Sequence, residues 1–172
     1  QYGPDRIETL VADQFATATD EEIADALFQV INHNQPDSLL FPATILGRSV
    51  APRLQAKLQT GLTGDCLDIF YKDGQLVQVK PTYGDNVMCD IVCPDERPQM
   101  VTVRPNTFRA EKTNDTVSEI TKAVFDFHKQ ADSQVIATEP IINSSSKLDD
   151  AKVVIALGRG AYNEKNIELA KD

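Results

Sequence analysis

The hydrophobic positions of residues 6–58 follow in turn the period of a strand and the period of a helix. Residues 6–12 form a short β-like run, and a helix is expected to begin soon after it. Thr19 is the expected N-cap of this helix, and Glu22 completes a capping box. The apolar side chains of the helix lie on one stripe, formed by Ile23, Leu27, Val30 and Ile31.

A second strand and a second helix follow. Residues 38–41 are apolar after the first position, which is typical of a strand covered on both faces. The next helix is expected over Ser49–Leu58, where Pro52 is tolerated because it would fall in the first turn. Strand, helix, strand and helix in this order predict right-handed crossovers and a parallel sheet.

After Gly61 the pattern changes to the alternation of antiparallel strands. A two-residue turn before Gln75 would place Ile69 opposite Gln78 and mix the two faces. We therefore favour a three-residue loop with Gly74 left-handed, which pairs Ile69 with Val77.

Two further strands are expected at residues 87–93 and 100–103. Residues 117–127 fit both a helix and a strand, and their β-branched and aromatic content favours the strand. The polar run 141–146 is typical of a linker, after which residues 152–157 predict a strand and 163–171 a helix.

These elements predict an α/β fold in which parallel βαβ units lead into an antiparallel or mixed sheet. We expect a Rossmann-type, three-layer architecture like that of adenine nucleotide hydrolases, with the first βα unit of a second domain after it. The expected domain bounds are 1–146, which lacks a lead βαβ unit, and 147–172, which begins a truncated second domain.

Composition narrows the functional classes. Hydrophobic residues at 41% and charged residues at 25% argue against disorder and against a disulfide scaffold. A net charge of −9 argues against nucleic acid and anionic membranes as partners, and no apolar run is long enough to insert in a membrane. The 3 cysteines are expected to be reduced core residues rather than metal ligands, as in a cytoplasmic protein.

One candidate site is the turn formed by Gly158, Arg159 and Gly160. A strand, a glycine turn and a helix N-terminus together can bind an anion such as a cofactor phosphate. The dinucleotide fingerprint would need a third glycine where Asn163 stands. A tight turn in which Asn163 caps the helix therefore stays an open alternative.

A second candidate is the loop of residues 43–49, which lies between a strand and a helix, where α/β folds bind ligands. Gly47 would give access to the backbone, and Arg48 and Arg53 are cations in an acidic chain. One interpretation is a free-standing adenine-nucleotide-binding module; the other is a helix start whose arginines pair with local acids. The sequence leaves both open.

Several ordered blocks of the chain closely resemble the alpha subunit of electron transfer flavoproteins. The blocks that carry the resemblance are Pro42–Leu54, Thr60–Cys66, Lys80–Met88, Cys93–Pro105 and Val153–Gly160. The chain departs from the family pattern at Pro42 and Leu157, where the family usually has glycine. The family's opening βαβ unit and most of its flavin domain are expected to be missing.

The resemblance implies an electron carrier rather than an enzyme that transforms a substrate. It implies a beta subunit as partner, FAD as the cofactor of the parent complex, acyl-CoA or similar dehydrogenases as donors, and a membrane quinone oxidoreductase as acceptor. The resemblance also implies that, in some anaerobes, such complexes are bifurcating and use NADH and ferredoxin as partners. A chain of this extent is not expected to retain FAD by itself.

The resemblance also assigns roles to particular residues. By position, Arg159 resembles an arginine near the flavin, between Gly158 and Gly160. The first domain of the family docks against the beta subunit, so four residues are interface candidates: Gly47, Arg48, Arg53 and Arg104.

Overall fold

The structure is a computed structural model of the 172-residue chain. It describes residues 3–112, 117–128, 132–140, 148, 151 and 153–171. The chain divides into two compact units, residues 1–136 and residues 137–172, and each is described by itself. The linker expected at 141–146, with the domain boundary expected after it, lies outside the described residues and stays a prediction.

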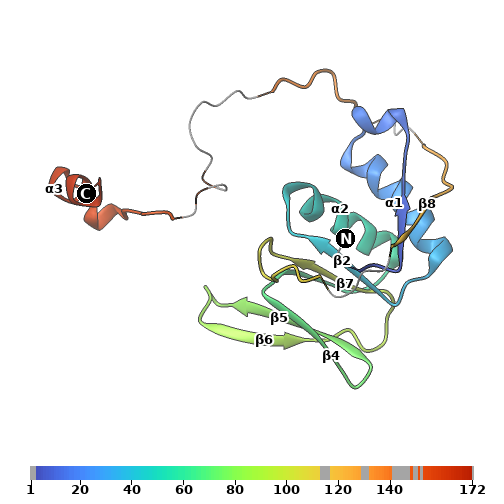
Figure 1. Cartoon of the computed structure of the whole chain (residues 1–172), viewed down its shortest axis with the longest axis horizontal. Coiled ribbons are helices and arrows are strands. Elements are labelled where there is room, and N and C mark those ends of the chain that lie inside the picture. The colour runs from blue at the N-terminus through green and yellow to red at the C-terminus, as the bar shows by residue number, and fades with distance from the viewer. Residues whose placement is uncertain are drawn as a thin grey trace. The chain divides into compact units, whose positions relative to one another are not determined.

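The first unit contains all the described strands and the two longer helices (Figure 1). Its elements in chain order are β1 (Arg6–Thr9), the 3₁₀ helix η1 (Asp13–Ala16), α1 (Asp20–Asn34), β2 (Ser38–Pro42), α2 (Ile45–Leu58), β3 (Leu62–Cys66), β4 (Asp68–Lys72), β5 (Gln75–Thr82), β6 (Val87–Ile91), β7 (Gln99–Val103) and β8 (Glu119–Lys122). The second unit contains the 3₁₀ helix η3 (Arg159–Ala161) and α3 (Glu164–Lys171).

The strands of the first unit form three sheets. A parallel sheet has the order β2-β7-β3, so β7 lies between two strands that precede it in the chain. Strands β4, β5 and β6 form an antiparallel sheet, and β1 pairs in parallel with β8. The predicted α/β fold, with parallel units leading into an antiparallel sheet, is confirmed.

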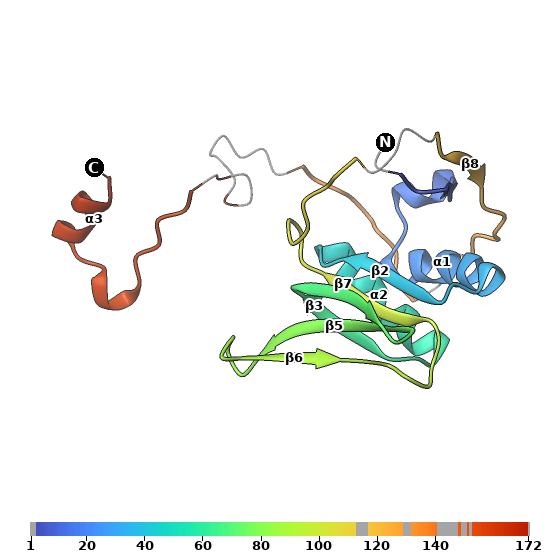
Figure 2. The same ribbon diagram turned by 60° about the horizontal axis from the view of Figure 1, so that its bottom comes forward.

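Three layers result from this arrangement (Figure 2). Helices α1 and α2 cover one face of the parallel sheet, and the core between them is formed by Ala24, Ile31, Val50, Leu54 and Met100. The antiparallel sheet covers the other face through a second core, formed by Cys66, Leu76 and Val101. Burial of these side chains is the main stabilising term of the unit.

Helix α1 begins as the sequence predicts. The Thr19 side chain accepts a hydrogen bond from the Glu22 N–H at 3.3 Å, and the Glu22 carboxylate accepts one from the Thr19 N–H at 2.8 Å. Both halves of the capping box are therefore present. The helix ends where Gln35 adopts a left-handed conformation, with a φ of 45°.

Helix α2 begins at Ile45, earlier than the predicted start at Ser49. The reason is that Thr44 caps the helix, since its side chain accepts the Gly47 N–H at 3.2 Å. Pro52 consequently lies inside the helix and not in its first turn, so that prediction was wrong. Proline has no N–H, so it cannot donate a hydrogen bond to the carbonyl one turn earlier in the helix. Because Pro52 is exposed, water can donate that hydrogen bond instead.

The β4–β5 hairpin has the two-residue turn, and the three-residue loop was wrong. Ile69 lies opposite Gln78, and Phe70 lies opposite Val77. Asp73 and Gly74 have φ values of 51° and 77°, as a type I′ turn requires at both central positions. Turn geometry therefore outweighs the pairing of apolar side chains and places the Gln78 amide in the interior, 1% exposed.

Strand β2 is an edge strand, which the continuously apolar run did not predict. Leu39 and Phe41 pack against the helical core, whereas Leu40 is 54% exposed. The expectation of two covered faces was wrong because the antiparallel sheet does not cover Leu40 on the outer strand.

Strand β8 confirms part of the strand predicted over residues 117–127, and the residues after it are irregular. These residues pack through aromatic contacts on η1. The Phe15 ring lies 5.7 Å from that of Phe125 and 5.4 Å from that of Phe127, measured between centroids. Such ring pairs contribute stability beyond that of the apolar area that they bury.

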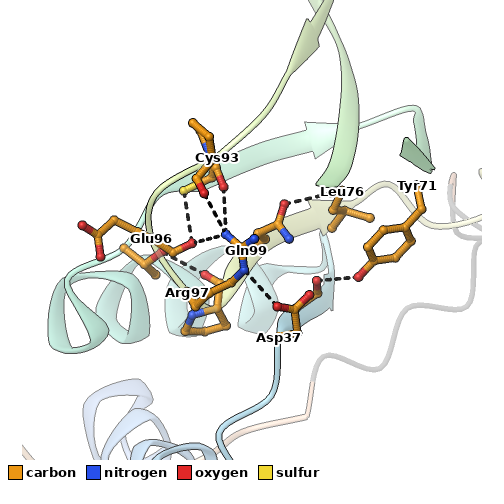
Figure 3. A network of polar contacts seen from close by, with 11 residues as sticks. Asp37, Tyr71, Leu76, Cys93, Glu96, Arg97 and Gln99 are labelled. Atoms are coloured by element: carbon orange, nitrogen blue, oxygen red, sulfur yellow. Dashed lines mark hydrogen bonds and ion pairs between the residues drawn. The ribbon is translucent and has the colours of Figure 1, made fainter. Parts of the chain in front are cut away.

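The turn before β7 is held by one arginine (Figure 3). Arg97 donates hydrogen bonds to the carbonyls of Cys93 and Glu96, at 3.2 and 2.9 Å, and its Nε lies 2.9 Å from the Asp37 carboxylate. The Asp37 carbonyl in turn accepts the Gln99 N–H at 2.9 Å. Arg97 thus ties the turn to the start of β2, where β7 enters the sheet.

In the second unit, the strand predicted over residues 152–157 is wrong for residues 153–157, and Lys152 lies outside the described residues. Val153 and Ile155 are 81% and 69% exposed, and no described strand lies beside them to supply backbone hydrogen bonds. The predicted helix is confirmed as α3, and its cap is Asn163, which accepts the Asn166 N–H at 2.9 Å.

We predict that Leu54→Ala lowers the free energy of unfolding by about 2–5 kcal/mol, because it leaves a cavity in the helical core. Leu54 is 0% exposed, whereas Leu40 is 54% exposed. Leu40→Ala is therefore the matched control, expected to change stability by less than about 1 kcal/mol. Urea denaturation measures both, and equal midpoints would contradict this assignment of the core.

We also predict that Gly74→Val lowers stability by about 1–2 kcal/mol, because a β-branched residue is strained at the left-handed φ of 77°. Gly64→Ala is the control, since Gly64 has no left-handed φ and its added Cβ would meet its nearest neighbour at 3.9 Å. Thermal unfolding of the two variants tests the turn type. A wild-type melting temperature for Gly74→Val would contradict the type I′ turn.

Candidate functional site

The carboxyl ends of the three parallel strands meet at one edge of the sheet. Strands β2, β7 and β3 end at Pro42, Val103 and Cys66, and helix α2 begins beside them. In α/β folds this edge is where ligands and partners bind. The predicted loop of residues 43–49 lies at this edge.

Gly47 allows the helix to approach the strand. A Cβ on residue 47 would lie 1.9 Å from the carbonyl oxygen of Pro42, so only glycine fits there. Gly47 is buried, and its N–H is bonded to Thr44. The residue therefore fixes the position of the loop, and its own N–H is already used.

Arg48 is bound to a carboxylate at the same edge. Its Nε and Nη2 donate to the two carboxylate oxygens of Asp65, each at 3.0 Å, in a bidentate pair. Asp65 is left-handed, with a φ of 60°, and its N–H donates to the Thr102 hydroxyl at 2.8 Å. The pair is half exposed, so it orders the loop more than it stabilises the fold.

Arg53 is also engaged within the unit. Its Nη1 donates to both the carbonyl and the hydroxyl of Ser49, each at 2.8 Å. The Ser49 hydroxyl donates to the Asp20 carboxylate and so links α2 to the first turn of α1. Arg53 therefore belongs to a polar junction between the two helices.

Arg104 follows β7 directly and differs from these two arginines. Its backbone N–H donates to the Cys66 carbonyl at 3.2 Å, which fixes the start of the loop after β7. Its side chain is half-buried and forms no ion pair or hydrogen bond with the described residues. It lines a groove of about 300 Å³ beside the ends of β2 and β7.

The thiol of Cys66 lies in the core just below this edge. Burial raises the pKa of the Cys66 thiol, with the nearby charge of Lys80 opposing and that of Asp65 adding to the effect. A buried thiol with a raised pKa stays neutral at physiological pH. Cys66 therefore packs in the core as a neutral side chain.

A second cavity, of about 460 Å³, lies at the C-terminal ends of α1 and α2. The cations on its rim are already paired, Lys57 with Asp25 at 2.5 Å and Arg97 with Asp37 at 2.9 Å. Among the described residues, the cations that line the larger cavity are thus paired, whereas Arg104 at the smaller groove is not.

The other candidate site, Gly158–Gly160, lies in the second unit. Arg159 begins the short helix η3, and Gly158 and Gly160 are exposed. A Cβ built on either glycine would meet no atom within 4 Å, so the described residues form no cradle that only glycine could line. These residues alone do not fit a flavin.

Sequence reasoning found the loop and its arginines but did not identify Asp65 as the partner of Arg48, or Asp20 as the partner of Ser49. Asp65 follows a glycine near the end of β3, a signal that could have placed it at this edge. Within the described residues, no group of three or more His, Cys, Asp or Glu side chains could hold a metal ion. No helix among them is long and apolar enough to span a membrane.

The comparisons with known proteins all point to one family. The electron transfer flavoprotein domain family matches residues 1–127. The chain is 34% identical to protein FixB of Clostridium saccharobutylicum over 98% of this chain and 52% of that protein. It is 33% identical to the electron transfer flavoprotein subunit alpha of Clostridium acetobutylicum, over 99% and 53% of the two chains.

A third relative is subunit LctC of the lactate dehydrogenase (NAD(+),ferredoxin) of Acetobacterium woodii, with 33% identity over 98% of this chain and 41% of that subunit. The chain spans about half the length of the first two relatives. The family match covers most of the chain, and it agrees with the motif blocks quoted above. The chain therefore belongs to the electron transfer flavoprotein family and is similar to its alpha subunits.

Proposed function

We propose that this chain works as part of an electron transfer flavoprotein alpha subunit, a carrier of electrons rather than an enzyme. The observation that carries the proposal is the family match over residues 1–127, with relatives that are named as alpha subunits. In the proposed complex the first unit docks against a beta subunit. FAD supplies the redox chemistry when it is bound, and the protein supplies position and docking surfaces.

The interface is proposed to lie at the carboxyl edge of the parallel sheet, around Gly47, Arg48, Arg53 and Arg104. Two features support this choice. The Arg48–Asp65 pair and the Arg53–Ser49 junction order this edge before a partner arrives, which lowers the entropy cost of binding. Arg104 adds a cation that the described residues leave unpaired.

The flavin is proposed to bind in the complete complex, with Gly158, Arg159 and Gly160 near it. Arg159 is exposed in this chain and forms no ion pair with the described residues, so its charge is available to an anionic cofactor. Since the described residues around these glycines form no cradle, the chain alone is not expected to retain FAD.

The proposed electron donors are acyl-CoA or similar flavin dehydrogenases, and the proposed acceptor is a quinone oxidoreductase or another carrier, in a cytoplasmic setting. The name of the LctC relative couples a lactate dehydrogenase to NAD⁺ and ferredoxin. That name supports a bifurcating complex as a second form of the same function.

We predict that the chain, co-expressed with its cognate beta subunit, elutes as a complex in size-exclusion chromatography. The chain expressed alone should lack stoichiometric flavin absorbance, because the residues near Gly158 form no cradle. Co-expression with an unrelated acidic α/β domain is the control. Failure to form any complex would count against the proposed function, and a chain that purifies alone with a full complement of FAD would refute the flavin prediction.

A further inference from the structure

The residues after β8 form an extended arm that lies against η1 and α1. We use the name arm for residues 124–128. Phe125 and Phe127 are half-buried, whereas the residues between and beside them are exposed, Val124 by 96%. This period of two is that of an extended chain that rests on the protein by one face. No side chain of the arm is fully buried, so the arm belongs to neither core.

Two kinds of contact hold the arm. The Phe15 ring of η1 contacts both phenylalanine rings of the arm, and it meets that of Phe127 edge-on, with an interplanar angle of 86°. On α1, the Gln29 amide binds the backbone of Asp126 at two points. Its Nε2 donates to the Asp126 carbonyl at 2.8 Å, and its carbonyl oxygen accepts the Asp126 N–H at 2.9 Å. Gln29 thus supplies both hydrogen bonds that a neighbouring strand would have given this residue.

The chain is held more firmly just before the arm. Strand β8 pairs with β1, and the ladder ends where the Ala123 N–H donates to the Thr9 carbonyl at 2.9 Å. Ser118 is 4% exposed, and its hydroxyl donates to the Pro4 carbonyl. A segment with few buried apolar contacts and exposed hydrogen bonds opens at a lower free energy than its surroundings. The arm can therefore detach while β8 stays in place.

The arm leads to the boundary between the two units. The first unit ends at Ile136. Gln134 and Val135 line a small cavity of about 90 Å³ together with Phe127 and Gln14, so the chain still lies against the first unit there. Detachment from Val124 onward would free residues 124–136, which span up to about 40 Å when they are extended.

From these observations we infer that the arm is a releasable connection between the two units. Docked, it holds the chain against η1 and α1 as far as Val135. Released, it turns about Ala123 and adds up to about 40 Å of chain to the connection. The inference goes beyond the proposed function, which gives these residues no role. Its contacts lie within the first unit and involve no open edge of a sheet.

Gln29 makes the docked state specific. An amide side chain matches the donor and the acceptor of one backbone residue, so it fixes the register of the arm on α1. The contacts of Phe15 add attraction between rings. Gln29→Met keeps the length of the side chain and a high helix propensity but removes both hydrogen bonds. This variant should therefore favour the released arm.

Limited digestion of the full chain with chymotrypsin tests the inference, because this protease cleaves after aromatic residues. The initial rate of cleavage after Phe125 and Phe127 reports the population of the released arm when release is fast relative to cleavage. Gln29→Met should raise this rate about tenfold, the usual effect of a lost intramolecular hydrogen bond. A wild-type rate in this variant would overturn the inference.

The urea dependence of the cleavage distinguishes release of the arm from unfolding of the whole unit. Cleavage in the wild-type arm should change little in low urea, because local opening exposes little surface. Cleavage after Phe28 and Phe41, which pack against the helical core, should be slower and should rise steeply with urea. An equally steep rise in the arm would mean that the arm opens only with the core, and the inference would fail.

Two controls accompany the digestion. His33→Gln is the matched variant, because His33 is exposed on the same helix and forms no hydrogen bond or ion pair with the described residues. It should be cleaved like the wild type. Tyr162 of the second unit is 71% exposed and serves as the internal reference, with one cleavage rate expected in every variant.

The length of the connection is tested by small-angle X-ray scattering of the full chain. The double variant Phe15→Leu, Gln29→Met loses both kinds of contact, so its maximum dimension should exceed that of the wild type. Equal maximum dimensions despite faster cleavage of the arm would overturn the claim that the arm sets the length. Neither experiment bears on the proposed function, which formation of a complex with the beta subunit tests separately.

Discussion

Strand β7 is the element on which both cores of the first unit depend. It is paired on both sides, and its Met100 side chain enters the helical core while Val101 enters the core between the sheets. The Gln99 side chain joins the layers directly, since its carbonyl oxygen accepts the Leu76 N–H at 2.9 Å. The Gln99 amide nitrogen is buried without a partner among the described residues, a cost that the bond to Leu76 offsets.

The charges at the carboxyl edge are organised around this strand. Asp65 bonds to the Thr102 hydroxyl through its N–H and to Arg48 through its carboxylate, so β7, β3 and α2 are connected at one point. The same strand delivers Arg104 to the edge, where no described side chain neutralises it. The edge is thus ordered by hydrogen bonds and ion pairs among the described residues, and Arg104 is the arginine there that they leave unpaired.

Local chemistry explains what the sequence could predict. The capping box at Thr19 and the cap at Asn163 involve residues a few positions apart. The first was predicted and is confirmed, and the second, which the sequence left as an alternative, is the one that the structure has. The errors had two sources. The exposure of Leu40 depends on the order of strands in the sheet, which joins residues far apart in the chain. The start of α2 and the type of the β4–β5 turn depend on local signals, the Thr44 cap and the left-handed Asp73 and Gly74, to which the prediction gave too little weight. The partner of Arg48 likewise comes from another element, Asp65 of β3, so the loop was located but its ion pair was not.

The position of β7 also has a consequence for synthesis of the chain. Strands β2 and β3 leave the ribosome before β7, so the two have no strand between them until residues 99–103 emerge. The hairpins of β4, β5 and β6 join neighbours in sequence and close at a small entropy cost in the meantime. All three strands of the antiparallel sheet are thus synthesised before β7. The nascent chain therefore already contains the sheet that will cover one face of β7 when β7 emerges.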